Sequence, residues 1–219
     1  MTARVAVMIS GRGSNFLALH GAMERKEVPA EIALVVSNVA EAPGLAKARS
    51  LRLPTVCFPH RLESGRLAHE RRVHAALEHA EIEWICLAGY MRLLSADFVS
   101  AYRQRILNIH PSLLPAFPGL EAQQQAIEWG VRVSGCTVHL VDEKLDHGPI
   151  VAQRTVPVRQ DDNASSLSAR ILAEEHRAYP EALRRLLTER WRVVGRRVEF
   201  LPGGVDSEAG GAYTYGPGG

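Results

Sequence analysis

The sequence has almost no excess of charge of either sign. Its 26 Lys and Arg residues are nearly balanced by 24 Asp and Glu residues, which gives a formal net charge of +2 over 219 residues. So small a charge supplies no strong field for attracting nucleic acid or an anionic membrane surface, and the arginines are scattered rather than grouped. We therefore expect neither nucleic acid nor a membrane as a partner.

Cysteine is scarce, and the amino-terminal region has no long hydrophobic run. The first apolar run stops at Ser10, so it is too short for a membrane span, and it lacks the cleavage pattern of a signal peptide. The three cysteines have no CxxC spacing and stand in apolar runs, which favours buried, reduced thiols over disulfides or a zinc site: Cys57, Cys86 and Cys136. These absences predict a cytoplasmic protein.

Histidine occurs nine times, but its spacing does not indicate a metal site. His69, His74 and His79 recur every five residues on one predicted helix. This spacing turns them around the helix surface instead of placing an i, i+4 pair on one face. We predict no bound metal.

The sequence does contain a regular alternation of apolar, β-branched runs with helical stretches. Hydrophobic residues make up 46% of the chain, enough for the core of one domain. Near-continuous apolar strands separated by helices are typical of a sheet covered on both faces. The predicted strands are 4–9, 32–36, 55–58, 84–88 and 106–109, and the predicted helices are 15–25, 44–51, 65–80 and 96–103. This pattern predicts a single α/β domain on an open, doubly wound, mostly parallel sheet, which is a Rossmann-like fold.

The second half of the chain differs in its pattern. Two predicted strands, 135–141 and 150–158, flank the polar stretch DEKLDHG, and a helix fits residues 164–188. From Leu201 the chain reads LPGGVDSEAGGAYTYGPGG, which is rich in glycine and poor in core-forming residues. We therefore predict a folded domain over residues 1–200 and a flexible tail over residues 201–219.

The stretch VMISGRGSNF places Gly11 and Gly13 between the first predicted strand and the first predicted helix. Backbone N–H groups at such a helix start attract anions. A dinucleotide fold would need a third glycine where Phe16 stands, and a P-loop would need a following Gly-Lys-Ser/Thr. Ser14 and Asn15 have short side chains that can cap the helix, so the loop fits one terminal phosphate. A simple tight turn is the alternative.

Asn108 and His110 lie two residues apart at the C-terminal end of the fifth predicted strand, and hence on one face of it. Ligands of open α/β sheets bind at that edge. Asp146, in KLDHGPI, lies in a loop from which a carboxylate can reach an imidazole and favour its charged form. With no Ser or Cys nucleophile beside them, these residues suggest oxyanion stabilisation and proton transfer without a covalent intermediate. Alternatively, His110 caps a strand end and Asn108 bonds a loop backbone.

Five motifs carry a resemblance to a known family: ISGRGSN, LAGYMRLLS, LNIHPSLLPAFPG, GCTVHLVDEKLDHGPIV and EEHRAYP. In this order and spacing, over residues 4–200, the chain resembles the phosphoribosylglycinamide formyltransferase family, folate-dependent enzymes of purine synthesis. The resemblance implies that the amine of glycinamide ribonucleotide attacks the formyl carbon of the co-substrate 10-formyltetrahydrofolate through a tetrahedral intermediate. It also implies that Asn108 and His110 bind the oxyanion, that His110 moves the proton, and that Asp146 tunes His110.

The resemblance assigns two binding regions as well. The stretch from Gly11 to Asn15 would hold the 5′-phosphate of the nucleotide, with Gly13, Ser14 and Asn15 closest, and Glu175 would lie near the ribose. Asn108 and residues of two further segments would contact the folate: Arg66, Met91, Arg92, Leu93 and Leu94. The alternatives are that Leu93 and Leu94 begin the core face of the next helix and that Arg66 and Glu175 are solvated surface charges.

The chain departs from the family pattern at two places. His147 follows Asp146 where many relatives have a small residue, and it could perturb the local titration. Residues 120–124 read LEAQQ where many relatives carry one or two histidines, so an auxiliary role of those histidines is not carried over.

Two other functions are compatible with the motifs. A formyltetrahydrofolate deformylase would hydrolyse the same folate, but we expect it to carry a regulatory domain ahead of the first strand. A noncatalytic module that binds folate or nucleotide would not need Asn108, His110 and Asp146 together. Methionyl-tRNA formyltransferase shares the SLLP motif but has a longer C-terminal domain for RNA. The sequence leaves assembly as a homodimer open.

Overall fold

Nine strands and six helices make up the part of the chain that the computed structural model describes, residues 2–59 and 65–204. The strands are β1 (Ala3–Ile9), β2 (Ala30–Ser37), β3 (Thr55–Cys57), β4 (Trp84–Leu87), β5 (Ile106–His110), β6 (Val133–Leu140), β7 (Ile150–Pro157), β8 (Glu189–Val194) and β9 (Arg197–Gly204). The helices are α1 (Ser14–Glu24), α2 (Pro43–Ser50), α3 (Arg66–His79), α4 (Ala96–Ala101), α5 (Ala122–Glu128) and α6 (Ala164–Thr188).

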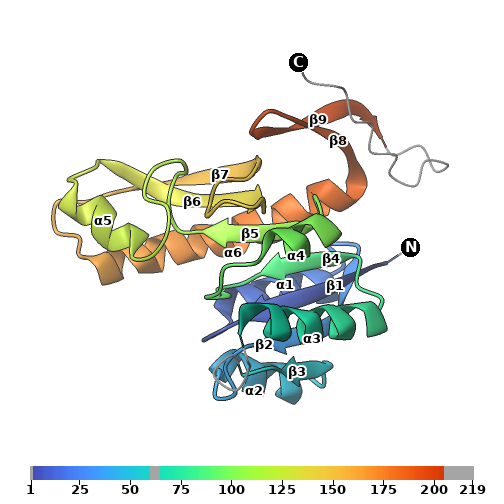
Figure 1. Cartoon of the computed structure of the whole chain (residues 1–219). Helices are drawn as coiled ribbons and strands as arrows, with labels where there is room; N and C mark the ends of the chain where they lie inside the picture. The colour runs from blue at the N-terminus through green and yellow to red at the C-terminus, as the bar shows by residue number, and fades with distance from the viewer. Residues whose placement is uncertain (1, 60–64, 205–219) are drawn as a thin grey trace.

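All nine strands join one sheet in the order β3-β2-β1-β4-β5-β6-β7-β9-β8 (Figure 1). The first five in this order are parallel, and β6 is antiparallel to both β5 and β7. The chain order reverses at β1, because β2 and β3 lie on one side of it and β4 lies on the other. At such a switch point, ligands bind in the crevice outside the carboxyl ends of the strands. The predicted open, mostly parallel α/β sheet is confirmed.

Helices cover both faces of this sheet. On β1, Val5, Val7 and Ile9 belong to a buried cluster that also contains residues of α1, α2 and α6, whereas Ala6 and Met8 belong to a second cluster with α3 and α4. Successive strand residues face opposite sides, so β1 must be apolar at every position that contacts the helices. This explains why its sequence is an unbroken apolar run rather than an alternating one.

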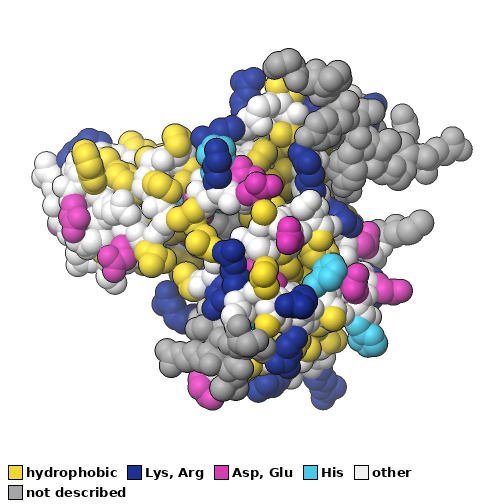
Figure 2. All heavy atoms as spheres, in the orientation of Figure 1, with side chains coloured by type: hydrophobic (Ala, Val, Ile, Leu, Met, Phe, Trp, Pro, Cys, Tyr) yellow, Lys and Arg dark blue, Asp and Glu magenta, His cyan; other side chains and the backbone are white. Residues whose placement is uncertain are grey.

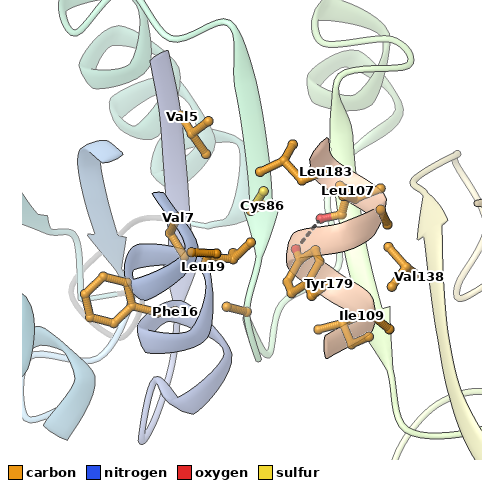
Figure 3. Close-up of a cluster of buried hydrophobic side chains, with 14 of the residues drawn as sticks. Val5, Val7, Phe16, Leu19, Cys86, Leu107, Ile109, Val138, Tyr179 and Leu183 are labelled. Atoms are coloured by element: carbon orange, nitrogen blue, oxygen red, sulfur yellow. Dashed lines mark hydrogen bonds between the residues drawn. The ribbon is translucent and has the colours of Figure 1, made fainter. Parts of the chain in front are cut away.

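Tyr179 of α6 ties this helix to the centre of the sheet. Its side chain is fully buried, and its hydroxyl lies 3.0 Å from the carbonyl oxygen of Leu87 on β4 and 2.9 Å from that of Leu107 on β5. Figure 3 shows the ring packed between α6 and the sheet, beside Leu107 and Ile109. Because Asn108 follows Leu107 directly, the contact fixes the strand that carries the predicted catalytic residues.

Helix α6 was predicted with the bounds that the structure has, whereas α5, β8 and β9 were not predicted. The segment of α5, AQQQAIE, contains three glutamines and only three apolar residues. It therefore has no helical hydrophobic stripe long enough to recognise. It forms a helix because Ala122 and Ala126 are buried against the rest of the protein.

The predicted start of the tail at Leu201 is wrong. Strand β9 extends to Gly204, so residues 201–204 belong to the folded domain, and the rest of the predicted tail, 205–219, lies outside the described residues. Gly204 pairs with Glu189 across the β8–β9 hairpin. Backbone pairing needs no side chains, which is why a glycine-rich stretch can still continue a strand.

Charged side chains of both signs lie on the face of the molecule that Figure 2 shows. No helix within 2–59 and 65–204 is both long enough and apolar enough to cross a bilayer. Basic and acidic side chains are interspersed over the visible face (Figure 2). This distribution agrees with the near-balance of charge in the sequence.

Candidate active site

Asn108 and His110 lie at the end of β5 and face the same side of the sheet. They are two residues apart in a regular strand, and each has a partner in antiparallel β6: Asn108 stands opposite His139, and His110 opposite Thr137. His110 is buried, with its side chain 6% exposed. The predicted placement of these two residues at the carboxyl end of the strand is therefore confirmed.

Asp146 reaches both residues from the loop between β6 and β7. Its Oδ2 lies 3.4 Å from His110 Nδ1, and its Oδ1 lies 3.5 Å from Asn108 Nδ2. The backbone N–H of Gly119 donates a hydrogen bond of 2.8 Å to Oδ2. The three residues that the sequence singled out are thus brought together, although 38 positions separate Asn108 from Asp146.

Both ring nitrogens of His110 face acceptors. Nε2 lies 2.8 Å from the carbonyl oxygen of Phe117, which can only accept, so Nε2 carries a proton and donates it. Nδ1 faces the carboxylate of Asp146 at 3.4 Å. A protonated Nδ1 is attracted to an ionised carboxylate, whereas a bare nitrogen lone pair is repelled by it. Both ring nitrogens are therefore placed so that they can donate, Nε2 to Phe117 and Nδ1 to Asp146.

His139 is a site residue that the sequence reasoning missed. Its Nδ1 lies 2.9 Å from the carbonyl oxygen of Leu140 and donates to it, and its Nε2 lies 3.1 Å from Asn108 Nδ2 and accepts from it. Burial lowers the pKa of His139, while the bond to Leu140 and the charge of Asp146 act in the opposite direction. A neutral His139 satisfies both contacts, and it holds the amide of Asn108 with Nδ2 turned toward β6.

The loop after β1 has the predicted shape but not the predicted cap. Gly13 is the N-cap of α1, with φ at 69°, and no side chain caps the helix. The expectation that Ser14 or Asn15 would cap it is therefore wrong. The reason is packing, because Asn15 is buried and its Nδ2 donates a 2.7 Å hydrogen bond to Glu175 Oε2 on α6. The first-turn N–H groups of α1 therefore have no side-chain cap within the described residues.

Glu175 is a buried residue and not a solvated surface charge. It is 7% exposed, and burial raises the pKa of its carboxyl, although the hydrogen bond from Asn15 partly offsets that effect. Among the described residues, Asn15 Oδ1 is buried without a hydrogen-bond partner. Glu175 and Asn15 together therefore offer acceptor oxygens beside the loop at residues 11–13, which is the arrangement that hydroxyl groups of a sugar need.

Gly44, at the start of α2, supports the loop from behind. Its N–H donates a 3.0 Å hydrogen bond to the carbonyl oxygen of Gly11. A Cβ at this position would lie 2.9 Å from that oxygen, 2.8 Å from Ile9 Cδ1 and 3.1 Å from Gly13 Cα. The close approach requires glycine here, and sequence reasoning did not identify it because the contact joins two segments distant in the chain.

The segment 91–94 is held at both ends. The Met91 N–H donates a 2.8 Å hydrogen bond to Ser10 Oγ, and the Ser95 N–H donates a 2.8 Å hydrogen bond to Glu70 Oε1. Met91 is 67% exposed and Leu93 is 59% exposed. Leu93 therefore does not begin a core face, whereas the partly buried Leu94 packs against the cluster formed with α3 and α4. Arg92, between Met91 and Leu93 in the chain, is half-buried.

Arg66 and His147 are the other two residues that the sequence singled out. Arg66 is the exposed first residue of α3, so its predicted contact with the folate stays a prediction. His147 points away from Asp146, and its Nδ1 bonds Asp142 Oδ2 at 2.7 Å. The expectation that His147 could perturb the local titration stays a prediction.

No metal site is found within residues 2–59 and 65–204, where no three His, Cys, Asp or Glu side chains are grouped so as to hold an ion. His69 instead bonds the hydroxyl of Tyr90 at 2.8 Å, and His74 lies 3.0 Å from that of Tyr102.

Comparison with known proteins places this geometry in a family. Residues 3–183 match the family described as Formyl transferase. The structure is similar to that of glycinamide ribonucleotide transformylase 1 from Symbiobacterium toebii, with a TM-score of 0.89, 45% sequence identity, and coverage of 91% of this chain and 94% of that chain.

Two curated relatives differ in length. The phosphoribosylglycinamide formyltransferase of Bacillus subtilis is 40% identical over 184 residues, which cover 84% of this chain and 94% of the relative. The trifunctional purine biosynthetic protein adenosine-3 of Homo sapiens is 45% identical over 181 residues, which cover 83% of this chain but 18% of the relative. The chain therefore spans only about a fifth of the human protein.

Proposed function

This chain belongs to the formyl transferase family, and from that premise we propose that it transfers the formyl group of 10-formyltetrahydrofolate to the amine of 5′-phosphoribosylglycinamide, a step of de novo purine biosynthesis. The observation that carries the proposal is that Asp146 lies within 3.5 Å of both Asn108 and His110. Those two residues stand at the end of β5 in a chain of the formyl transferase family. The match to the Bacillus subtilis phosphoribosylglycinamide formyltransferase, which covers 94% of that protein, supports the choice of nucleotide.

The chemistry requires that a negative charge on oxygen be stabilised. When the amine nitrogen bonds to the formyl carbon, the carbonyl electron pair moves onto oxygen. When the tetrahedral intermediate collapses, the bond from carbon to the folate nitrogen breaks, and the proton that the amine loses ends on that nitrogen. Asn108 Nδ2 has one hydrogen directed at His139 and a second held only loosely by Asp146, at 3.5 Å. The second hydrogen is the donor that we assign to the oxyanion.

His110 supplies the other donor and moves the proton. Its Nε2–H already donates to a carbonyl oxygen, that of Phe117, at 2.8 Å, so the formyl oxygen would compete with this carbonyl for the same proton. The carboxylate of Asp146, 3.4 Å from Nδ1, would stabilise a positive charge that forms on the ring during proton transfer. The ring would take up the proton that the amine loses, as general base, and then give a proton to the leaving folate nitrogen, as general acid, so that it ends in the state in which it began.

The nucleotide would bind along α1. The uncapped first turn of α1, with Gly13, Ser14 and Asn15, would hold the 5′-phosphate through backbone N–H groups. Asn15 Oδ1 and the carboxylate of Glu175 would accept from the ribose hydroxyls, which would satisfy a buried oxygen that has no partner among the described residues. Gly11 would also line the phosphate site, and a Cβ added at this residue would meet nothing within 4 Å.

The folate would bind beside the segment after β4. Met91 and Leu93 expose apolar side chains, and the segment's ends are fixed by Ser10 and Glu70. An apolar wall with backbone polar groups at fixed positions suits a flat pterin ring. We assign the folate to Arg66, Met91, Arg92, Leu93, Leu94 and Asn108.

One assay distinguishes this function from the alternatives. The protein is incubated with 10-formyltetrahydrofolate, with and without glycinamide ribonucleotide, and release of tetrahydrofolate is followed. Release that requires the nucleotide and yields the formylated nucleotide supports the transferase. Release without the nucleotide indicates the deformylase, and binding of either ligand without any release indicates a noncatalytic module.

We also propose that the protein works in the cytoplasm on small molecules rather than on nucleic acid. Cys57, Cys86 and Cys136 are all free thiols in the structure, which suits a reducing compartment. A homodimer is the assembly to test first, by measuring the mass of the protein in solution.

A further inference from the structure

The loop between β6 and β7 holds Asp146 in a backbone conformation that few residues adopt. Asp146 has a φ of 46°, in the left-handed region, where a residue with a Cβ stays only if its surroundings impose the conformation. Gly148, two residues later, has no room for a Cβ, which would lie 1.9 Å from the carbonyl oxygen of Leu140. The position of Asp146 therefore depends on what holds residues 142–148.

A contact across the loop joins its two ends. His147 Nδ1 lies 2.7 Å from Asp142 Oδ2, and Asp142 Oδ1 accepts a 3.0 Å hydrogen bond from the N–H of Lys144. The side chain of Asp146 points inward to His110, while that of His147 points outward to Asp142. The residue next to the proposed catalytic acid thus closes the loop on its other side.

A second contact comes from the β8–β9 hairpin, 49 residues further along the chain. At its turn, Arg196 Nε donates a 2.9 Å hydrogen bond to the carbonyl oxygen of His147, and the carbonyl oxygen of Arg196 accepts a 3.0 Å hydrogen bond from the N–H of Ile150. The hairpin extends the sheet beyond β7 (Figure 1). Arg196 therefore connects the loop to the hairpin at the edge of the sheet.

We propose that His147 and Arg196 are positioning residues that fix the carboxylate of Asp146 against His110. His147 closes the loop through Asp142, and Arg196 anchors the peptide that follows Asp146. Without either contact, Asp146 would leave the left-handed conformation part of the time, and its carboxylate would separate from His110 and from the N–H of Gly119. The effect on catalysis rests on the proposed function, whereas the effect on the position of Asp146 does not.

The Gly119 N–H reports this position directly, because it donates to Asp146 Oδ2 at 2.8 Å. Amide hydrogen exchange at Gly119 is measured in the full chain of the wild type and of His147→Ala and Arg196→Ala, with Asp146→Ala as the reference for complete loss. We expect exchange about tenfold faster in both variants than in the wild type. Arg192→Ala is the matched control, since it removes an ion pair with Glu199 on the same hairpin without touching the loop.

The kinetic measurement separates positioning from general stability. We expect kcat for formyl transfer to fall about tenfold in His147→Ala and Arg196→Ala, with the KM for both substrates nearly unchanged, because misplacing a group that acts on the transition state lowers kcat. His147→Asn should restore most of kcat, since its Nδ2 can donate to Asp142 from the position of Nδ1.

Three outcomes are distinguishable. Faster Gly119 exchange together with a lower kcat supports the proposal. If the wild type transfers no formyl group but the variants still show faster Gly119 exchange, the positioning role is supported and the proposed function fails. Wild-type exchange at Gly119 in both alanine variants overturns the proposal, whatever the kinetics are. A variant that fails to fold is replaced by His147→Gln or Arg196→Gln, judged by the same exchange measurement.

Discussion

The carboxylate of Glu175 accepts a 2.7 Å hydrogen bond from Asn15, a residue 160 positions earlier in the chain. Both side chains are buried between α1 and α6. Burial raises the pKa of Glu175, and one neutral donor only partly offsets this. A buried carboxylate with so little compensation lowers stability, and proteins retain such groups at sites where function needs them.

Glu175→Gln should therefore stabilise the protein at neutral and alkaline pH. A carboxyl whose folded-state pKa is raised favours folding below its unfolded pKa of about 4.3, and this contribution is lost as the pH rises through the folded pKa. The melting temperature of the variant should exceed that of the wild type at pH 8, and the difference should shrink toward pH 4. The KM for the nucleotide should rise.

Glu174→Gln is the control for that prediction. Glu174 precedes Glu175 on α6, but it forms ion pairs with Arg154 and Arg177 near the surface. Removing its charge should not stabilise the protein at pH 8. A Glu175→Gln variant that melts below the wild type at pH 8 would show that the carboxylate is better compensated than its contacts indicate.

Asp146→Asn should lower kcat while leaving both KM values nearly unchanged. The substitution keeps the shape of the side chain and removes the charge that faces His110 Nδ1 at 3.4 Å. The imidazolium would lose its counter-charge, so kcat should fall by about 10² or more, the size typical of losing one oxyanion-stabilising group. Steady-state kinetics with each substrate varied in turn measures kcat and both KM values of the variant.

Asp161→Asn tests whether the loss of any carboxylate has this effect. Asp161 is exposed in the turn before α6, and its substitution should leave kcat and its pH profile unchanged. Wild-type turnover by Asp146→Asn between pH 6 and 8 would show that Asp146 does not act through the charge of His110.

His139→Phe should reduce kcat by about tenfold or more, and His139→Gln should retain more activity. The Gln side chain can place an oxygen near the Nε2 position, where it accepts from Asn108 Nδ2, whereas Phe fills the same volume without an acceptor. Because burial lowers the pKa of His139, the ring remains neutral at pH 7, so its removal should not shift the pH profile. Equal activities of the two variants would mean that the amide of Asn108 needs no partner on β6.

The sequence predicts those parts of the fold and site that depend on neighbouring residues. The bounds predicted for α6 agree with the structure, in which Asn163 caps its start and its buried residues recur with helical spacing. Asn108 and His110 were found as a pair because they are two residues apart in one strand. The loop at Gly11 and Gly13 was found because glycines separate a strand from a helix.

The missed features depend on segments that meet only after folding. His139 faces Asn108 through the register of β5 with β6, which no local pattern encodes. Asn15 turns to Glu175 instead of capping α1 because α6 packs beside it. Gly44 is required by the backbone of the loop at residues 11–13. Register and the packing of distant segments decide all three.

Tyr179→Phe should destabilise the protein by about 1–3 kcal/mol, the cost of leaving buried polar groups without a partner. The hydroxyl lies within 3.0 Å of the carbonyl oxygens of Leu87 and Leu107, where water cannot replace it. For a chain of this length, about 1 kcal/mol lowers the melting temperature by roughly 2–4 °C. Tyr102→Phe is the control, since its hydroxyl bonds the half-exposed His74, and it should cost less. Equal losses would show that the two bonds of the Tyr179 hydroxyl add no more stability than the single bond of Tyr102 to His74.

Gly44→Ala should weaken nucleotide binding more than folate binding. The new Cβ would lie 2.9 Å from the carbonyl oxygen of Gly11 and 3.1 Å from Gly13 Cα, and backbone atoms at such distances must move. The loop would shift toward the space proposed for the 5′-phosphate, so the KM for the nucleotide should rise about tenfold, while the KM for the folate and kcat change little. Overpacking should also cost about 1–3 kcal/mol of stability.

Gly21→Ala is the control for the effect of Gly44→Ala on nucleotide binding, because it adds the same methyl group at another glycine. Gly21 lies within α1, where the nearest atom to a new Cβ is the flexible end of Arg25, at 3.1 Å. Replacing a glycine in a helix by alanine gains roughly 0.5–1 kcal/mol, so this variant should be at least as stable as the wild type and bind the nucleotide normally. A rise in the nucleotide KM that is equal in the two variants, or equal for both substrates in Gly44→Ala, would show that Gly44 supports the fold in general and not the phosphate loop. Steady-state kinetics with each substrate varied in turn, together with thermal unfolding of the three proteins, measures all of these quantities.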